Sequence, residues 1–150
     1  MTCITLHIPC LPDLDLSANR RRSRHYMAQA SDTRMERERA LVELKAAWFP
    51  AVRGAPVEVP FRVPVSLHWT LYWPKGTRRT MEDEAGWTSR ARNAGSLAAM
   101  LKPWTDAMKD LGWIVNDSPK YVPTVSYTSV PGSLRGPSMR LVIATGDRPV

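Results

Sequence analysis

Two segments of the chain alternate between apolar and polar residues, and two others repeat apolar residues at the spacing of a helix. The alternation within residues 1–11 predicts an N-terminal strand, and the alternation within residues 57–73 predicts a second strand. Pro60 and Pro64 indicate that the first part of this second strand is irregular or lies at a sheet edge, because proline cannot donate a ladder hydrogen bond.

The helical spacing predicts a first helix over residues 33–48 and a second over residues 97–111. Ser31 and Asp32 are candidate N-caps of the first helix, and Pro50 lies near its expected end. The apolar stripe of the second helix consists of Leu97, Leu101, Trp104, Met108 and Leu111. Ser96 is its candidate N-cap and Gly112 its C-terminal glycine.

Pro103 complicates the second helix, because a proline inside a helix costs about 3 kcal/mol. Either the helix starts near Lys102, with Pro103 in its first turn, or it bends at Pro103. The apolar residues 113–115 then predict a short strand that runs into the turn formed by residues 116–119.

The remaining chain completes a β-α-β-loop-α-β-β-β order. Residues 122–130 and 139–144 predict two more strands, paired as a hairpin across residues 131–138. Residues 74–92 form a long polar loop without apolar period. At 150 residues this order predicts a single α+β domain, with a mixed β-sheet and two main helices on one face.

The charge of the chain favours an anionic partner. The formal net charge is +7 and the pI is about 9.9, so nucleic acid is the first candidate and a generically basic protein the alternative. Four arginines stand together and predict a solvated basic edge: Arg20, Arg21, Arg22 and Arg24.

Other sequence features bear on the surroundings of the protein. No apolar run reaches the length of a membrane span, and the first 16 residues lack the pattern of a signal peptide. We therefore expect a cytoplasmic protein without a membrane partner. Cys3 and Cys10 are expected to be free thiols, and the scattered histidines do not favour a zinc site.

Three residues near the second helix could handle phosphates. Lys102 and Asp106 are four residues apart, so they share a helix face, and Asp117 follows a predicted strand end. A carboxylate at that position can hold Mg²⁺, and a lysine can stabilise an anionic transition state. The alternatives are a helix-surface ion pair for Lys102 and Asp106 and an ordinary turn for Asp117.

The arrangement of these motifs resembles the RusA-type Holliday-junction resolvases over most of the chain. Residues 16–20, LSANR, resemble the opening segment of that family. The motifs that follow in that family are, in chain order, Asp-x-Asp-Asn-Leu, a lysine, Asp-x-Leu, a glycine before a hydrophobic residue, and Asp-Asp. Here the corresponding residues are Asn93-Ala94-Gly95-Ser96-Leu97, Lys102, Asp106, Leu111-Gly112 and Asn116-Asp117.

The resemblance implies a homodimeric, Mg²⁺-dependent endonuclease that cuts branched DNA, a four-way junction, in a bacterial or phage-infected cell. Lys102 and Asp117 would be catalytic, and Asp106 structural or close to the site. Metal oxygens would come from Asp117, Asn93 and Asn116. The DNA backbone would contact six arginines: Arg20, Arg21, Arg22, Arg24, Arg90 and Arg92.

The sequence departs from the family at its acidic positions. Asn93 and Gly95, or in an ungapped alignment Ser96 and Ala98, replace carboxylates, and Asn116 replaces the first residue of the Asp-Asp pair. Because fewer anionic ligands weaken Mg²⁺ binding, the alternative is a RusA-fold protein that binds branched DNA without cutting it. The acidic run Glu82-Asp83-Glu84 is a possible replacement source of ligands.

Overall fold

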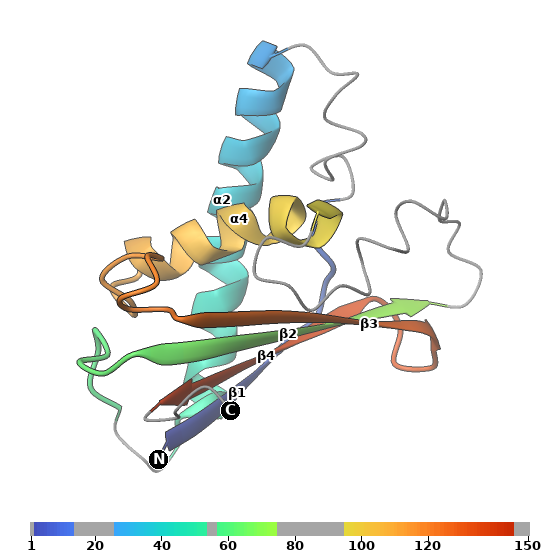
Figure 1. Cartoon of the computed structure of the whole chain (residues 1–150). Helices are drawn as coiled ribbons and strands as arrows, with labels where there is room; N and C mark the ends of the chain where they lie inside the picture. Colours follow the sequence, from blue (N-terminus) through green and yellow to red (C-terminus); the bar gives the residue numbers. More distant parts are fainter. Residues whose placement is uncertain (1, 14–25, 54–56, 75–94, 146–150) are drawn as a thin grey trace.

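The protein is an α+β domain, and in its described residues two helices pack on one four-stranded mixed sheet. The computed structural model describes residues 2–13, 26–53, 57–74 and 95–145. The helices and strands follow one another along the chain as β1 (Thr2–Ile8), α2 (Tyr26–Ala51), β2 (Val65–Pro74), α4 (Gly95–Asp110), β3 (Thr124–Ser133) and β4 (Ser138–Thr145), as drawn in Figure 1. The α+β class and the mixed sheet predicted from the sequence are therefore confirmed.

The sheet has the order β1-β4-β2-β3. Strand β4 is antiparallel to both β1 and β2, whereas β3 runs parallel to β2. A parallel pair needs a long crossover connection, and the segment that contains α4 provides it between β2 and β3. The unit β2-α4-β3 thus places the end of α4 close to the start of β3.

The predicted hairpin between the last two strands is wrong. Strands β3 and β4 are consecutive in the chain, but β2 lies between them in the sheet. Tyr72 of β2 lies opposite Val130 of β3 on one side and opposite Ser138 of β4 on the other. The connection from β3 to β4 therefore passes the end of β2, which alternation alone could not reveal.

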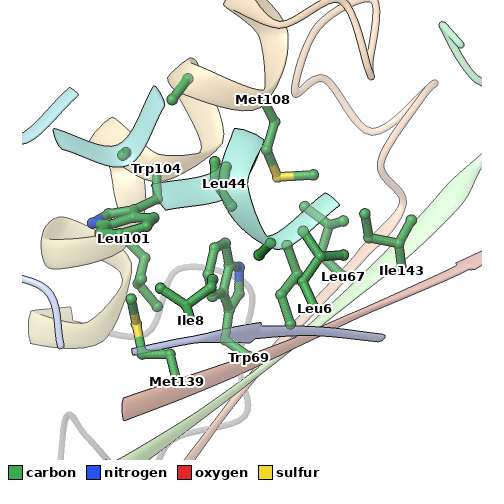
Figure 2. Close-up of a cluster of buried hydrophobic side chains, with 14 of the residues drawn as sticks. Leu6, Ile8, Leu44, Leu67, Trp69, Leu101, Trp104, Met108, Met139 and Ile143 are labelled. Carbon is green, nitrogen blue, oxygen red and sulfur yellow. The ribbon is translucent and has the colours of Figure 1, made fainter. Parts of the chain in front are cut away.

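The core lies between the helices and one face of the sheet. In Figure 2, Leu44 of α2 and Trp104 of α4 point toward Leu67 and Trp69 of β2, with Leu6 of β1 beside them. All of these side chains are buried. Trp69 and Trp104 meet edge to face, with ring centroids 6.4 Å apart and planes at 77°, an arrangement that aromatic pairs favour.

Both helices begin earlier than the sequence predicts. Helix α2 begins at Tyr26, so Ser31 and Asp32 lie inside it and are not caps. Thr33 is also internal, and its hydroxyl donates to the Gln29 carbonyl at 2.9 Å, a bond typical of threonine within a helix. Helix α4 begins at Gly95 and continues through Pro103, so of the two alternatives for Pro103 the start near Lys102 is wrong.

Two predicted strand boundaries also differ. Residues 57–64 are not part of β2, in agreement with the irregularity that Pro60 and Pro64 predict. Residues 113–115 do not form a strand. Trp113 is instead buried and stacks on Trp48 of α2, with ring centroids 4.4 Å apart. The apolar character of this segment serves packing rather than strand pairing.

Several expectations fall outside the described residues. They concern most of the polar loop at 74–92, the opening motif at 16–20 and the acidic run at 82–84. None of the described helices combines the length and the hydropathy needed to cross a membrane.

Candidate functional site

The candidate site lies where the end of α4 meets the segment that leads into β3. Helix α4 ends in a Schellman motif, in which the Gly112 N–H donates to the Lys109 carbonyl and the Trp113 N–H to the Met108 carbonyl, both at 3.0 Å. Gly112 has a φ of 76°, which glycine adopts without the cost that a side chain would bring. This glycine reverses the chain so that residues 116–122 return alongside the helix.

The returning segment is held by local hydrogen bonds. The Asn116 side-chain oxygen Oδ1 accepts the Ser118 N–H at 2.8 Å, which forms an Asx-turn. The Ser118 carbonyl then accepts the N–H groups of Tyr121 and Val122 at 3.0 and 2.9 Å. The Val65 N–H donates to the Tyr121 carbonyl at 2.9 Å and attaches the segment to β2. Asp117 is therefore presented from a braced turn.

Lys102 contacts two carboxylates. Its ammonium Nζ is 3.1 Å from Asp106 Oδ1, one turn further along α4, and also forms an ion pair with Asp117 Oδ2. The exposed fractions of the side chains are 54% for Lys102, 18% for Asp106 and 38% for Asp117. The structure therefore brings together the three residues that the sequence singles out near the second helix.

The pKa values of two members of this group reflect their contacts. The Asp117 carboxyl has its pKa lowered by the hydrogen bond from Lys102, against a smaller opposing effect of burial. Partial burial of Lys102 opposes its charge, but hydrogen bonds from Nζ to Asp117 and Asp106 raise its pKa on balance. Lys102 and Asp117 are thus charged near neutral pH, and with the Asp106 carboxylate the group carries one net negative charge.

A pocket of about 190 Å³ opens beside Lys102 and Asp117. Its polar lining also includes Thr105, and its apolar wall consists of Ala98, Val122, Val125 and Tyr127. This volume is below the range of about 300–1,000 Å³ typical of pockets for drug-sized ligands. The pocket can therefore admit a small fragment, such as part of one nucleotide, next to a cation and a carboxylate.

Three of the four side chains of the apolar wall were not singled out from the sequence, and Ala98 was named only as the residue at an acidic position of the family in an ungapped alignment. Ala98 lies on α4, and Val122 precedes β3, which contributes Val125 and Tyr127. Ala98 is near Lys102 because the two are four residues apart on the helix, whereas the parallel alignment of β3 beside β2, joined through α4, brings Val122, Val125 and Tyr127 there. No local sequence signal marks them as a group.

The donor atoms at this site match Mg²⁺ in kind. The carboxylate oxygens of Asp106 and Asp117 point toward one position, and the Lys102 ammonium occupies that position. Mg²⁺ is commonly held by one or two carboxylates together with substrate phosphates. The two carboxylates of this site are therefore enough to hold Mg²⁺ if the Lys102 ammonium moves away from them. Among the described residues, no group of three or more His, Cys, Asp and Glu side chains could hold a metal ion.

The other expected metal ligands are placed less favourably or are not described. Asn116 Oδ1 is used by the Ser118 N–H, so it serves the turn. Asn93 lies outside the described residues. The described part of the site therefore offers two carboxylates and one ammonium.

A second ion pair lies further along α4. Arg37 of α2 forms a bidentate contact with Asp110 of α4, at 2.5 Å for each N–O pair. This contact lowers the pKa of the Asp110 carboxyl. Asp110 does not line the pocket and has a side-chain exposure of 34%, close to that of Asp117. It is therefore a matched comparison for Asp117.

The surplus positive charge lies mainly outside the described residues. Those segments contain ten of the 21 Lys and Arg residues but only five of the 14 acidic residues. They include all six arginines expected to contact DNA: Arg20, Arg21, Arg22, Arg24, Arg90 and Arg92. At Lys102 itself, one ammonium faces two carboxylates.

The two cysteines and two of the histidines lie away from this site. Cys3 is exposed and Cys10 half-buried, and both are free thiols. Burial raises the pKa of the Cys10 thiol, which makes it a weak nucleophile. His68 Nδ1 is 2.6 Å from Ser126 Oγ on the sheet face opposite the helices, and His7 is exposed on β1.

Comparison with known proteins finds no family model that matches the chain and no curated protein that matches it.

Proposed function

We propose that the protein binds branched DNA and acts on it as a RusA-like, Mg²⁺-dependent junction endonuclease, working as a homodimer. The observation that carries this proposal is the meeting of Lys102, Asp106 and Asp117 at one pocket. The motif resemblance selects these same three residues from the sequence alone. The net charge of +7 supplies the general attraction to a polyanion.

The described residues can perform several parts of this task. The Lys102 ammonium has three donors, and its two carboxylate partners leave one for a phosphate oxygen. Asp106 and Asp117 provide hard oxygen ligands, and the apolar wall with Tyr127 can contact a sugar or a base. A bound Mg²⁺ would supply Lewis-acid stabilisation of charge on the phosphate.

A second candidate is a protein that binds the junction but does not cut it. The Lys102 ammonium already pairs with both carboxylates, and Asn93, Gly95 and Ser96 replace acidic residues of the family motif. Fewer anionic ligands mean weaker metal binding. These two observations favour binding without cleavage, with Lys102, Asp106 and Asp117 then serving as an ion-paired contact surface.

One experiment separates the two candidates. The purified chain is incubated with a labelled four-way junction and with Mg²⁺ or Mn²⁺, and nicked products and gel retardation are measured together. The nuclease proposal predicts symmetrical nicks that Asp117→Asn abolishes while retardation persists. Asp110→Asn is the matched control and should leave cleavage intact, because Asp110 pairs with Arg37 outside the pocket.

The outcomes are distinct. Retardation without nicks, unchanged by Asp117→Asn, would favour the binding candidate and contradict the nuclease. Equal affinity for the junction and for linear duplex would contradict both candidates. A monomeric mass in light scattering at micromolar concentration would contradict the proposed homodimer.

A further inference from the structure

A large groove lies far from Lys102, along the opposite edge of the sheet. It has a volume of about 660 Å³ and runs between β1 and α2. Strand β1 is the last strand on this side of the sheet, whereas the Lys102 pocket borders β3 on the other side. We name it the edge groove, and its lining residues are Cys3, Thr5, His7, Pro9, Glu43, Ala46, Ala47, Pro50 and Ala51.

The alternation of β1 fixes where the edge groove lies. Ile4, Leu6 and Ile8 are buried beneath α2, so the side chains of the intervening residues point to the other face of the sheet. A groove that touches both α2 and these intervening residues must run along the free edge of β1. Among the described residues β1 pairs with β4 alone, so no described strand pairs with the backbone groups on its outer edge.

We propose that the edge groove binds an extended peptide segment of a partner protein, which adds to β1 as a further strand. Strand addition beside a helix satisfies the outer N–H and C=O groups of β1 through main-chain hydrogen bonds. Alternate side chains of the peptide then point toward α2, where specificity is determined. This proposal is independent of the proposed action on DNA.

The helix wall predicts the apolar part of the peptide. Ala46, Ala47 and Ala51 are small, which leaves room for a larger apolar side chain opposite them. Val42 and Phe49 stand beside Ala46 on the helix surface and are 67% and 68% exposed. A docked segment can cover this apolar ridge, which water otherwise surrounds.

The charge of the edge groove decides between possible occupants. Among the described residues that line it, Glu43 is the only Asp, Glu, Lys or Arg, so a lysine or arginine in the peptide is the complementary partner. Nucleic acid is disfavoured, because none of these lining residues is a lysine or arginine. A second copy of β1 is also disfavoured, because Thr2–Ile8 contains neither lysine nor arginine.

The probe for this proposal is a library of random nonapeptides displayed on phage and selected on the full chain. The expected result is enrichment of sequences that alternate apolar and polar residues and carry one lysine or arginine. A synthetic peptide of the enriched sequence should protect edge amides of β1 from hydrogen exchange. Ala46→Arg should abolish its binding, because a large side chain at this exposed position fills the groove.

Glu43→Lys should weaken binding about fivefold or more, because a favourable charge pair becomes a repulsive one. Lys45→Ala is the control, since Lys45 is exposed on α2 but does not line the groove.

Failure to enrich such sequences, or binding unaffected by Ala46→Arg, would overturn the proposal. A dimer that Ala46→Arg converts to a monomer would also overturn it, by showing that a second copy covers the edge. Junction binding should be the same in wild type and in Ala46→Arg.

Discussion

At the scale of single residues, a lysine held between two carboxylates forms the centre of the candidate site. Lys102 and Asp106 were predicted to share a helix face, and they do because their four-residue spacing is nearly one helical turn. Asp117 joins them because Gly112 and the Asx-turn of Asn116 return the chain. The group is partly exposed, so its effect on stability is modest while its charges remain accessible to a ligand.

The Lys102–Asp117 pair should make stability depend on pH. The pKa of Asp117 is lowered in the folded state. The contribution of the Asp117 carboxylate to the free energy of unfolding is therefore complete above the unfolded pKa of about 3.9, and it is lost as the pH falls through the folded pKa. Asp117→Asn should therefore lower the free energy of unfolding by roughly 0.2–1 kcal/mol at pH 7, with the difference disappearing in acid. Urea unfolding of both proteins between neutral and acidic pH measures this.

At alkaline pH, the stability that Lys102 contributes should decrease as the pH rises. The pKa of Lys102 is raised in the folded state, so its contribution is present below the unfolded pKa of about 10.4 and is lost as the pH rises through the folded pKa. The contribution of Asp117 in acid has its own test. A stability difference between wild type and Asp117→Asn that grows as the pH falls below about 4 would contradict the lowered pKa of Asp117.

Glu36 is a second residue whose environment predicts a measurable effect. It is buried and accepts hydrogen bonds from Trp104 Nε1 at 3.2 Å and from the Asp13 N–H at 2.5 Å, and it pairs with Arg39 at 2.7 Å. Glu36→Leu should lower the free energy of unfolding by about 1–3 kcal/mol, because the buried Trp104 N–H loses its acceptor.

Glu36→Gln keeps an acceptor in the same place and should cost less. Chemical denaturation of the two variants and of wild type provides the comparison. Equal losses for leucine and glutamine would show that the hydrogen bond to Trp104 does not stabilise the fold.

At the scale of elements, the turn at Gly112 positions the site. Gly112→Ala should destabilise the protein by about 1–2 kcal/mol, because a residue with a Cβ is strained at a φ of 76°. A Cβ added there meets nothing within 4 Å, so the cost is conformational and not steric crowding. Gly112→Asn should cost less, since asparagine tolerates this conformation. Equal stability of Gly112→Ala and wild type in urea would rule out this role of the turn.

Sequence patterns predicted elements with strong local signals and missed those decided by distant contacts. The apolar stripe of the second helix was predicted from the regular spacing of Leu97, Leu101, Trp104, Met108 and Leu111, and the first four of these are buried in α4. The early start of α2 was missed because its first turns carry polar residues resembling caps. Pro103 suggested a late start for α4, yet tertiary packing tolerates it as a buried helix residue.

Strand pairing was the least predictable feature. Residues 124–133 and 138–145 have the spacing of a hairpin, but each of the two strands pairs with β2 instead. The site was predicted only in its charged members. Val122, Val125 and Tyr127 belong to it through the βαβ crossover, which no local pattern encodes.

At the scale of the whole molecule, the uneven distribution of charge governs the expected encounter with DNA. The described residues are close to neutral, and most of the positive surplus belongs to the segments that hold the arginines. We therefore expect the Lys102 site to select a position on the DNA, whereas the arginines supply most of the affinity. Affinity and site selection should then respond to different substitutions.

Salt dependence measures the arginine contribution. If the six arginines each neutralise one phosphate, affinity should fall about a thousandfold between roughly 50 and 200 mM salt. Replacing Arg20, Arg21, Arg22 and Arg24 together with alanine should reduce the slope of log affinity against log salt by about 3.6. Arg62→Ala is the control, because Arg62 is 82% exposed and pairs with Glu58. A slope unchanged by the fourfold replacement would contradict the role of this arginine cluster.

The most direct test of the central claim is a competition binding measurement between a four-way junction and a linear duplex of the same length and composition. It is made at physiological salt without divalent metal, so that binding is measured apart from cleavage. We predict that the junction binds at least about tenfold more tightly than the duplex, a difference of about 1.4 kcal/mol. Equal affinities for the two DNAs would contradict the claim that this protein recognises branched DNA.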